Sequence, residues 1–164
     1  MDTKETDLHL LLDNQLCFAV YAASREITKL YRPFLKELGL TYTQYITMLV
    51  LWEVEELSVK QLGEKLFLDS GTLTPLLKKL EAAGLVTRRR SAEDERVLLV
   101  HITDLGHRLK DKARSIPMKL ACGIGLSQHE LIFLRESLKN LTEDIHNRKD
   151  EDLIACGLDD EATE

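Results

Sequence analysis

Two short segments, predicted to be helices joined by a tight turn, constrain the fold of this chain more than any other feature. Ser58 and Gln61 have the spacing of a capping box, so a short helix is predicted to start there. Pro75 has no amide hydrogen and fits the first turn of a helix, so a second helix is predicted to begin near residues 70–72. Gly84 supplies the C-terminal cap of that second helix.

Two β-rich runs follow the second helix directly. LVTRRR (residues 85–90) and RVLLVHIT (residues 96–103) are separated by SAEDE, a spacing typical of a hairpin with a charged tip. A helix pair followed by a hairpin is the arrangement of a winged helix-turn-helix. In such a unit the second helix enters the major groove of DNA, where the base edges can be distinguished.

Helical periodicity and caps predict four further helices. They span residues 8–38, 41–55, 103–125 (interrupted by Pro117) and 127–149. The fold class is therefore mainly α, with six helices and a small β-hairpin wing.

The charge distribution is compatible with DNA binding, although the net charge is −6. Residues 150–164 contain seven acidic side chains and no basic one, whereas residues 60–119 contain 13 Lys or Arg against 8 Asp or Glu. An acidic tail thus masks a basic middle segment.

Candidate DNA contacts lie at the start of the second short helix and on the hairpin. Small polar side chains there are suited to close approach, and lysines one turn later are suited to phosphates. The hairpin arginines are suited to phosphates or to the adjacent minor groove; the alternative is that they only solvate an edge strand. The candidates are Ser70, Thr72, Thr74, Lys78, Lys79, Arg88, Arg89, Arg90 and Arg96.

The three cysteines form neither a C-x-x-C pair nor a Cys/His cluster at zinc spacing, so we expect no metal site and no cofactor. Cys17 lies in an uncharged run, residues 16–23, that needs cover from the core or from a partner chain. It is expected roughly three turns into its helix, too far from the N-terminus for the helix dipole to help. A packed, inert hydrophobe is the ordinary interpretation of such a cysteine.

Hydrogen-bond donors to the Cys17 sulfur would make it reactive, and all four tyrosines lie within residues 21–45. Tyr31 follows Cys17 by fourteen residues, which is about 21 Å along a helix. Tyr31 therefore reaches a Cys17 sulfur only if the sulfur belongs to a second subunit.

The segments LDNQLCFAVYAASREITKLYRPF, LFLDSGTLTPLLKKLEAAGLV and DER (residues 94–96) resemble the MarR family, in particular its organic hydroperoxide resistance regulators, OhrR. The resemblance implies a homodimer on pseudopalindromic double-stranded operator DNA. It also implies that Cys17 is the redox-sensing residue, hydrogen-bonded by Tyr31 and Tyr42 of the partner chain, and that Asp94 and Arg96 form a pair at the wing tip.

The same resemblance implies a repressor that binds DNA when reduced and is released when an organic hydroperoxide oxidises Cys17. An intersubunit disulfide with the resolving residue Cys122 would follow; otherwise Cys122 is only a small buried residue. Cys156 matches no feature of the family and is treated as incidental. Two alternatives are a MarR-type regulator released by a phenolic or lipophilic ligand, and a thiol peroxidase.

This interpretation divides the chain into three regions and places it in the cytoplasm. Residues 1–40 and 103–149 are expected to form a helical dimerisation region, residues 41–102 the DNA-binding region, and residues 150–164 an acidic tail. No segment has the length and apolarity of a membrane span or of a secretory signal, so no membrane association is expected. The chain is expected to be a regulator and not an enzyme.

Overall fold

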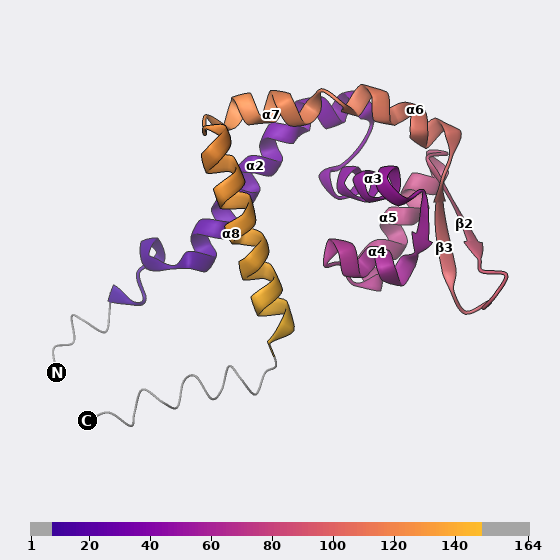
Figure 1. Cartoon of the computed structure of the whole chain (residues 1–164), viewed down its shortest axis with the longest axis horizontal. Helices are drawn as coiled ribbons and strands as arrows, with labels where there is room; N and C mark the ends of the chain where they lie inside the picture. Colours follow the sequence, from indigo (N-terminus) through magenta and orange to yellow (C-terminus); the bar gives the residue numbers. More distant parts are fainter. Residues whose placement is uncertain (1–7, 149–164) are drawn as a thin grey trace. The chain divides into compact units, whose positions relative to one another are not determined.

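The computed structural model describes residues 8–148, which form two units, residues 8–123 and residues 124–148 (Figure 1). The elements of the first unit are η1 (Leu12–Asn14), α2 (Leu16–Leu38), α3 (Tyr42–Val54), β1 (Glu56–Ser58), α4 (Val59–Leu66), α5 (Ser70–Ala82), β2 (Val86–Arg90), β3 (Leu98–Ile102), α6 (Asp104–Ala113) and α7 (Ile116–Ile124). The second unit contains α8 (Gln128–Asn147). The predicted fold class, mainly helical with a small antiparallel wing, is confirmed.

The predicted helix pair is α4 and α5, and local side chains fix both ends of the turn between them. The Ser58 hydroxyl accepts from the Gln61 amide at 3.1 Å while the Gln61 side chain accepts from the Ser58 amide at 2.9 Å, which is the predicted capping box. A Cβ atom on Gly63 would lie 2.7 Å from the carbonyl oxygen of Leu68, so only glycine permits so tight a turn. α5 begins at Ser70 as predicted, although Pro75 then lies just beyond its first turn.

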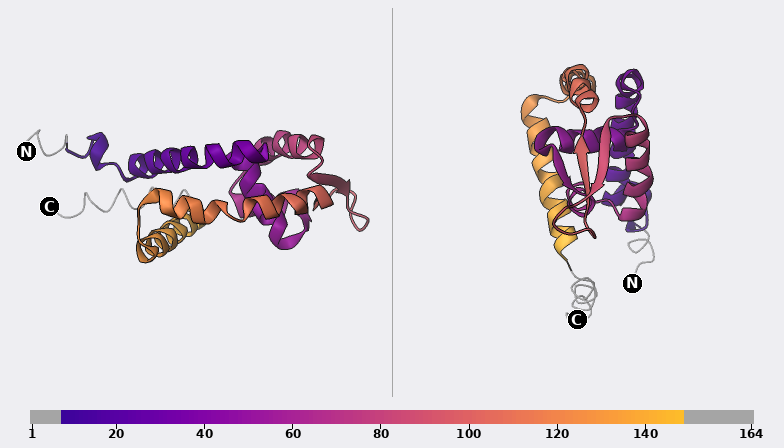
Figure 2. Two further views of the ribbon diagram at one scale, coloured as in Figure 1. Left: turned by 90° about the horizontal axis from the view of Figure 1, so that it is seen from above. Right: turned by 90° about the vertical axis from the view of Figure 1, so that its right-hand side faces the viewer.

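The sheet has three antiparallel strands in the order β1-β3-β2 (Figure 1). The predicted hairpin is β2–β3, with Arg88 opposite Val100, and its loop extends beyond the helices of the unit (Figure 2). β1 was not predicted, since only four residues separate α3 from α4 there. It pairs Glu56 with His101 and makes β3 the central strand.

The core of the first unit lies between α3, α5 and the sheet. Trp52 of α3 is buried, and its indole N–H donates to the carbonyl oxygen of Gly106 in α6 at 2.9 Å. Lys110 of α6 also contacts α3, because its ammonium group donates to the carbonyl oxygen of Trp52 at 3.0 Å. These bonds tie α6 to the DNA-reading half of the unit.

The first long helix begins at Leu16, and the predicted start at residue 8 was wrong. Gln15 has an extended backbone, and the side-chain amide of Asn14 donates to the carbonyl oxygen of Leu8 at 2.7 Å, which stabilises a separate turn before the helix. Cys17 is consequently the second residue of α2, not a residue three turns inside it.

The predicted fifth helix consists of two helices, α6 and α7. Pro117 is the second residue of α7, where its missing amide hydrogen costs nothing. A capping box of Ser127 and Glu130 starts α8, in agreement with the helix predicted from residue 127, and Thr103 caps α6. Within residues 8–148, no helix combines the length and the apolar character that a membrane span requires.

Gly106→Ala tests the close packing of α6. A Cβ at this position would lie 2.4 Å from the carbonyl oxygen of Leu85 and 2.7 Å from Cγ1 of Ile102, so α6 would have to shift. We expect the free energy of unfolding to fall by about 2–3 kcal/mol in chemical denaturation. Gly123→Ala is the matched control, because a Cβ there meets nothing within 4 Å. It should raise the free energy of unfolding by roughly 0.5–1 kcal/mol; equal effects of the two substitutions would contradict this packing.

Candidate functional site

One face of α5 is buried and the opposite face carries most of the predicted DNA contacts. Leu73, Leu76, Leu77 and Leu80 are buried at helical spacing, which holds the helix against the core. The exposed positions include Ser70, Thr72, Thr74, Lys78 and Lys79, as the sequence indicated.

Asp69, which was not among the predicted site residues, caps the exposed start of α5. Its carboxylate accepts from the Thr72 amide at 2.9 Å and from the Thr72 hydroxyl at 2.8 Å. These hydrogen bonds lower the pKa of Asp69, so it stays ionised as a cap. The Thr74 hydroxyl donates to the carbonyl oxygen of Ser70 at 2.7 Å. Both threonines are therefore held in fixed orientations on the exposed face.

Two of the three consecutive wing arginines are engaged with glutamates of the same chain. Arg88 contacts the Glu81 carboxylate through its backbone amide, Nε and Nη2, at 2.6–3.1 Å. The same hydrogen bonds lower the pKa of Glu81. Arg89 donates to both carboxylate oxygens of Glu56 at 3.0 Å. The sequence predicted DNA contacts for both arginines, but the structure gives both of them partners within the fold.

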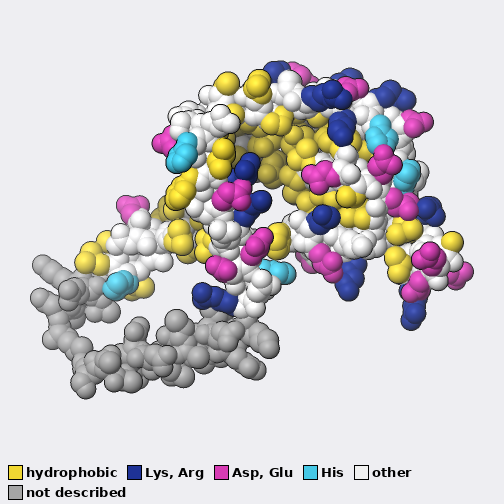
Figure 3. Space-filling view, viewed as in Figure 1, with side chains coloured by type: hydrophobic (Ala, Val, Ile, Leu, Met, Phe, Trp, Pro, Cys, Tyr) yellow, Lys and Arg dark blue, Asp and Glu magenta, His cyan; other side chains and the backbone are white. Residues whose placement is uncertain are grey.

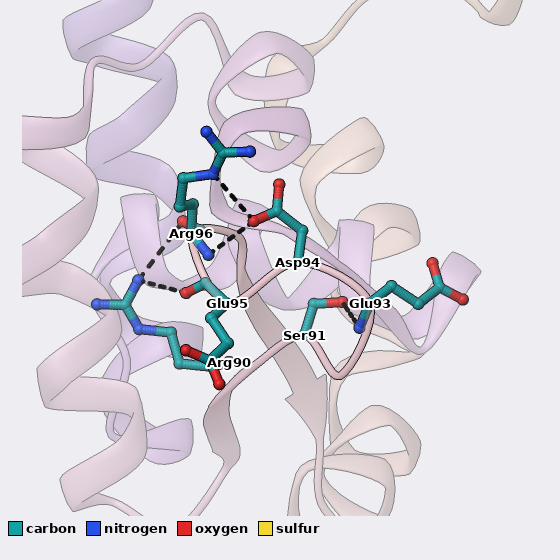
Figure 4. Close-up of polar contacts among 6 residues, drawn as sticks. All are labelled: Arg90, Ser91, Glu93, Asp94, Glu95 and Arg96. Atoms are coloured by element: carbon teal, nitrogen blue, oxygen red, sulfur yellow. Dashed lines mark hydrogen bonds and ion pairs between the residues drawn. The ribbon is translucent and has the colours of Figure 1, made fainter.

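At the wing tip, one arginine closes the loop and another keeps its side chain exposed (Figure 4). Nη1 of Arg90 donates to the carbonyl oxygen of Glu95 at 3.0 Å and so closes the loop. Asp94 accepts from the amide of Arg96 at 3.0 Å and from its Nε at 3.2 Å. The Arg96 side chain nevertheless stays 92% exposed, so it can reach a ligand beyond the loop.

Charges of both signs are interspersed over α4, α5 and the hairpin on the face drawn in Figure 3. The structure pairs Lys60 with Glu64 at 3.9 Å in α4 and Arg96 with Asp94 in the wing. The candidate DNA surface therefore carries charges of both signs. Individual Lys and Arg side chains, and not a continuous basic patch, are exposed there for contact with DNA.

Cys17 has an exposed thiol in the first turn of α2. Gln15, the N-cap residue, makes no side-chain hydrogen bond to this turn. The first amide groups of any helix lack intrahelical acceptors, and anions, thiolates included, are favoured beside them. The sequence did not indicate this feature, because its helical periodicity begins eight residues before the helix itself.

Tyr31, Tyr42 and Tyr45 form one aromatic cluster between α2 and α3. The ring centroid of Tyr31 lies 5.0 Å from that of Tyr42 and 5.7 Å from that of Tyr45. Burial, followed by the proximity of Tyr42 and Tyr45, raises the pKa of Tyr31 to about 12. Burial also raises the pKa values of Tyr42 and Tyr45. All three phenols are therefore neutral near pH 7 and able to donate a hydrogen bond.

The hydroxyls of these three tyrosines make no hydrogen bond to another residue of the segment 8–148. By contrast, the exposed Tyr21 accepts from Arg25 at 2.7 Å. Tyr31 and Cys17 lie on the same helix, about 21 Å apart at 1.5 Å per residue. The structure thus brings Tyr31 and Tyr42 together, but it does not bring them to the thiol of their own chain.

Cys122 has an exposed thiol near the end of α7, and both Cys17 and Cys122 are free. Cys156 lies outside the described residues. The other possible interpretation of Cys122, a buried small residue, does not fit its exposure in the single chain.

Comparison with known proteins identifies the family. Residues 29–113 match the family model described as transcriptional regulator SarA/Rot. The chain is 50% identical over 143 residues to the organic hydroperoxide resistance transcriptional regulator of Bacillus subtilis, which covers 85% of this chain and 95% of that protein.

Solved structures show the same relationship. The structure of reduced AbfR bound to DNA aligns with a TM-score of 0.68 and 34% identity, over 84% of this chain and 96% of that one. The structure of disulfide-formed AbfR aligns with a TM-score of 0.57 and 31% identity, over 90% of this chain and 100% of that one. The family model and the curated relatives are transcriptional regulators and not enzymes. The chain therefore belongs to the MarR and SarA type of winged-helix transcriptional regulators, in the branch of the organic hydroperoxide resistance regulators.

Proposed function

We propose that the chain is a redox-sensing repressor that binds operator DNA as a reduced homodimer and leaves it when an organic hydroperoxide oxidises Cys17. The observation that carries this proposal is the exposed thiol of Cys17 in the first turn of α2. The sulfur is not packed into the core of its own chain, and first-turn amide groups, which favour a thiolate, lie beside it. Two structures of one relative support the redox part, since AbfR has been solved both reduced on DNA and with a disulfide formed.

The chemistry begins with the thiolate of Cys17. Its sulfur attacks one peroxide oxygen, the O–O bond breaks, the other oxygen leaves as an alcohol after taking a proton, and the sulfur becomes a sulfenic acid. The thiolate of Cys122 from the second subunit then attacks that sulfur, and the oxygen leaves as water to give an intersubunit disulfide. Because Cys122 is exposed near the end of α7, its sulfur is free to make this attack.

The thiol site is completed in trans. Tyr31 and Tyr42 are neutral donors too far along the chain to reach their own Cys17, so they would bind the sulfur of the second subunit. The apolar side chains that a dimer would cover are exposed in the single chain. They are Leu16, Val20, Tyr21 and Leu30 of α2, and Ile132, Phe133, Leu134, Leu138 and Ile145 of α8.

DNA reading belongs to residues 41–102 and dimerisation to residues 1–40 and 103–149, with residues 150–164 as an acidic tail outside the described residues. Ser70, Thr72 and Thr74 would face base edges in the major groove, with Lys78 and Lys79 on phosphates. Arg96, oriented by Asp94, would enter the adjacent minor groove. Arg88, Arg89 and Arg90 would contribute mainly by shaping the wing.

A ligand-released regulator is the competing function, and substitution of Cys17 separates the two. Cys17→Ser should bind a labelled operator duplex with unchanged affinity when reduced. After one equivalent of cumene hydroperoxide the wild-type affinity should fall more than about tenfold, roughly 1.4 kcal/mol, and the variant's should not change. Fluorescence anisotropy measures both affinities. If the Cys17→Ser protein still left the DNA on peroxide treatment, a pocket ligand would be the better account.

Cys122→Ser is the companion variant. It should still take up one oxygen on Cys17, but it should form no covalent dimer in intact-mass measurements under denaturing, non-reducing conditions. A covalent dimer that persists in Cys122→Ser would remove Cys122 from the mechanism and leave Cys17 as the sensor.

Tyr31→Phe should slow the reaction of Cys17 with cumene hydroperoxide about tenfold or more, because a thiolate loses a charge-assisted hydrogen bond. Stopped-flow measurement of sulfenic acid formation gives the rate. Tyr21→Phe is the control and should react at the wild-type rate, since the Tyr21 hydroxyl is already engaged with Arg25.

Mixed dimers test whether the site forms in trans. In a dimer of one Cys17→Ser chain and one Tyr31→Phe chain, the remaining thiol faces the intact tyrosine of the other chain. We expect the wild-type rate from this dimer; the slow rate would place the tyrosine in cis and contradict the geometry above.

The wing arginines should separate into two classes. Arg96→Ala should weaken DNA binding and lower the salt dependence of log K, because a cation is lost from the minor groove, with unchanged stability. Arg88→Ala should lower the midpoint of thermal unfolding instead, because it leaves Glu81 without its partner. Titrations at several salt concentrations and thermal melts distinguish the classes, and a shared phenotype would contradict the division.

A further inference from the structure

Phe67 combines two features that each cost free energy. It is the C-cap of α4 with a left-handed backbone, φ 52° and ψ 41°, a conformation that favours glycine and is unfavourable for an aromatic residue. Its side chain is also 55% exposed. An exposed aromatic residue in a strained conformation is a reason to look for a function at that position.

The residues on either side of Phe67 fix the backbone of its turn. Leu66 and Leu68 on either side pack against the core, and the Leu68 amide donates to the carbonyl oxygen of Gly63 at 3.0 Å. The turn from α4 into α5 is therefore fixed, and Phe67 is the apolar residue of that turn that stays exposed. Asp69, which caps α5, follows two residues later.

We propose that the ring of Phe67 contacts the C5-methyl group of a thymine on the major-groove edge of the operator, beside the bases that the start of α5 reads. This inference rests on the proposed DNA binding and deepens it by naming one base contact. The thymine methyl is an apolar group on the major-groove edge of a base pair, whereas the other bases present hydrogen-bonding groups there. Contact between the ring and the methyl removes apolar surface of both from water.

The position of Phe67 makes DNA the occupant that fits best. It precedes by three residues Ser70, the first residue of α5, whose exposed face carries the small polar contacts and Lys78 and Lys79. An apolar ring on that turn adds a contact that the surrounding hydroxyl and ammonium groups do not provide.

Uracil substitution tests the contact directly, because uracil lacks the methyl group and keeps the pairing edge of thymine. The probe is the duplex that the reduced wild-type protein enriches from a randomised library. Each thymine is replaced singly, and affinities are measured by anisotropy. We expect one thymine per half-site at which uracil weakens wild-type binding about fourfold, the effect of one buried methylene-sized group.

Phe67→Gly should bind the thymine duplex about five- to tenfold more weakly and should not discriminate between thymine and uracil at that position. Glycine adopts the left-handed conformation freely, so the variant should fold; Phe67→Asn is a second variant that tolerates the same backbone. Glu55→Gly is the matched control, because Glu55 is the other non-glycine residue with positive φ in residues 8–148. This control should keep both the affinity and the discrimination.

The outcomes are distinguishable. If Phe67→Gly discriminates between thymine and uracil as the wild type does, or binds with wild-type affinity, the proposed contact is wrong while DNA binding stands. If the reduced wild-type protein enriches no duplex at all, the proposed function itself is overturned, and the contact with it.

Discussion

The close packing around Gly106 is the constraint on which the DNA-reading half depends. At this residue α6 approaches the backbone of Leu85 so closely that no Cβ fits, and its carbonyl oxygen receives the indole N–H of Trp52. Helix α3, the start of the sheet and α6 are joined there in one rigid contact. Because densely packed interiors switch between discrete arrangements and do not deform continuously, a shift of α6 would move the reading helix with it. If Cys122 of α7, the next helix along the chain, is oxidised as proposed, this contact would link that change to α5.

The three consecutive arginines of the wing have different contacts and therefore different roles. Three consecutive arginines alternate across a strand, so successive side chains meet different neighbours. Arg88 meets Glu81 of α5, and Arg89 meets Glu56 of β1. These pairs anchor the strand to elements on either side of it, and Arg90 closes the loop at its end. The arginine most exposed to a ligand is Arg96, on the other side of the tip.

Much of the fold was predictable because its determinants are local. Capping boxes at Ser58 and Ser127, and a glycine at residue 39, act within one turn of chain, and each starts or ends a helix where the sequence placed it. β1 was not predictable, because its three residues become a strand only by pairing with β3, more than forty residues away. The ion pairs of Arg88 and Arg89 were missed for the same reason: their partners come from other elements.

The candidate thiol site was only partly predictable from the sequence. The tyrosine cluster and the environment of Cys17 each departed from the prediction, for different reasons. The pairing of Tyr31 with Tyr42 followed from the resemblance to a family, but Tyr45 joins the cluster through its contact with Tyr31 of another helix, which the sequence did not indicate. The environment of Cys17 was mistaken because helical periodicity continues through residues 8–15, whereas the amides of Asn14 and Gln15 bond to backbone carbonyls and stop the helix from extending backwards. Apolar spacing thus identifies which face of a helix is covered, and side-chain competition for the backbone decides where the helix begins.

Placing Cys17 in a first turn changes what the second subunit has to supply. Deep inside a helix, a thiol would depend entirely on the partner's tyrosines for stabilisation of its thiolate. In a first turn without a side-chain cap, amide groups of its own chain are already beside it. In the proposed dimer, the protonated phenols of Tyr31 and Tyr42, whose pKa values burial raises further, would add donors from the second chain. In the proposed dimer each chain supplies its own thiol and two chains supply the full set of hydrogen-bond donors, so loss of those bonds on oxidation would act at the subunit interface itself.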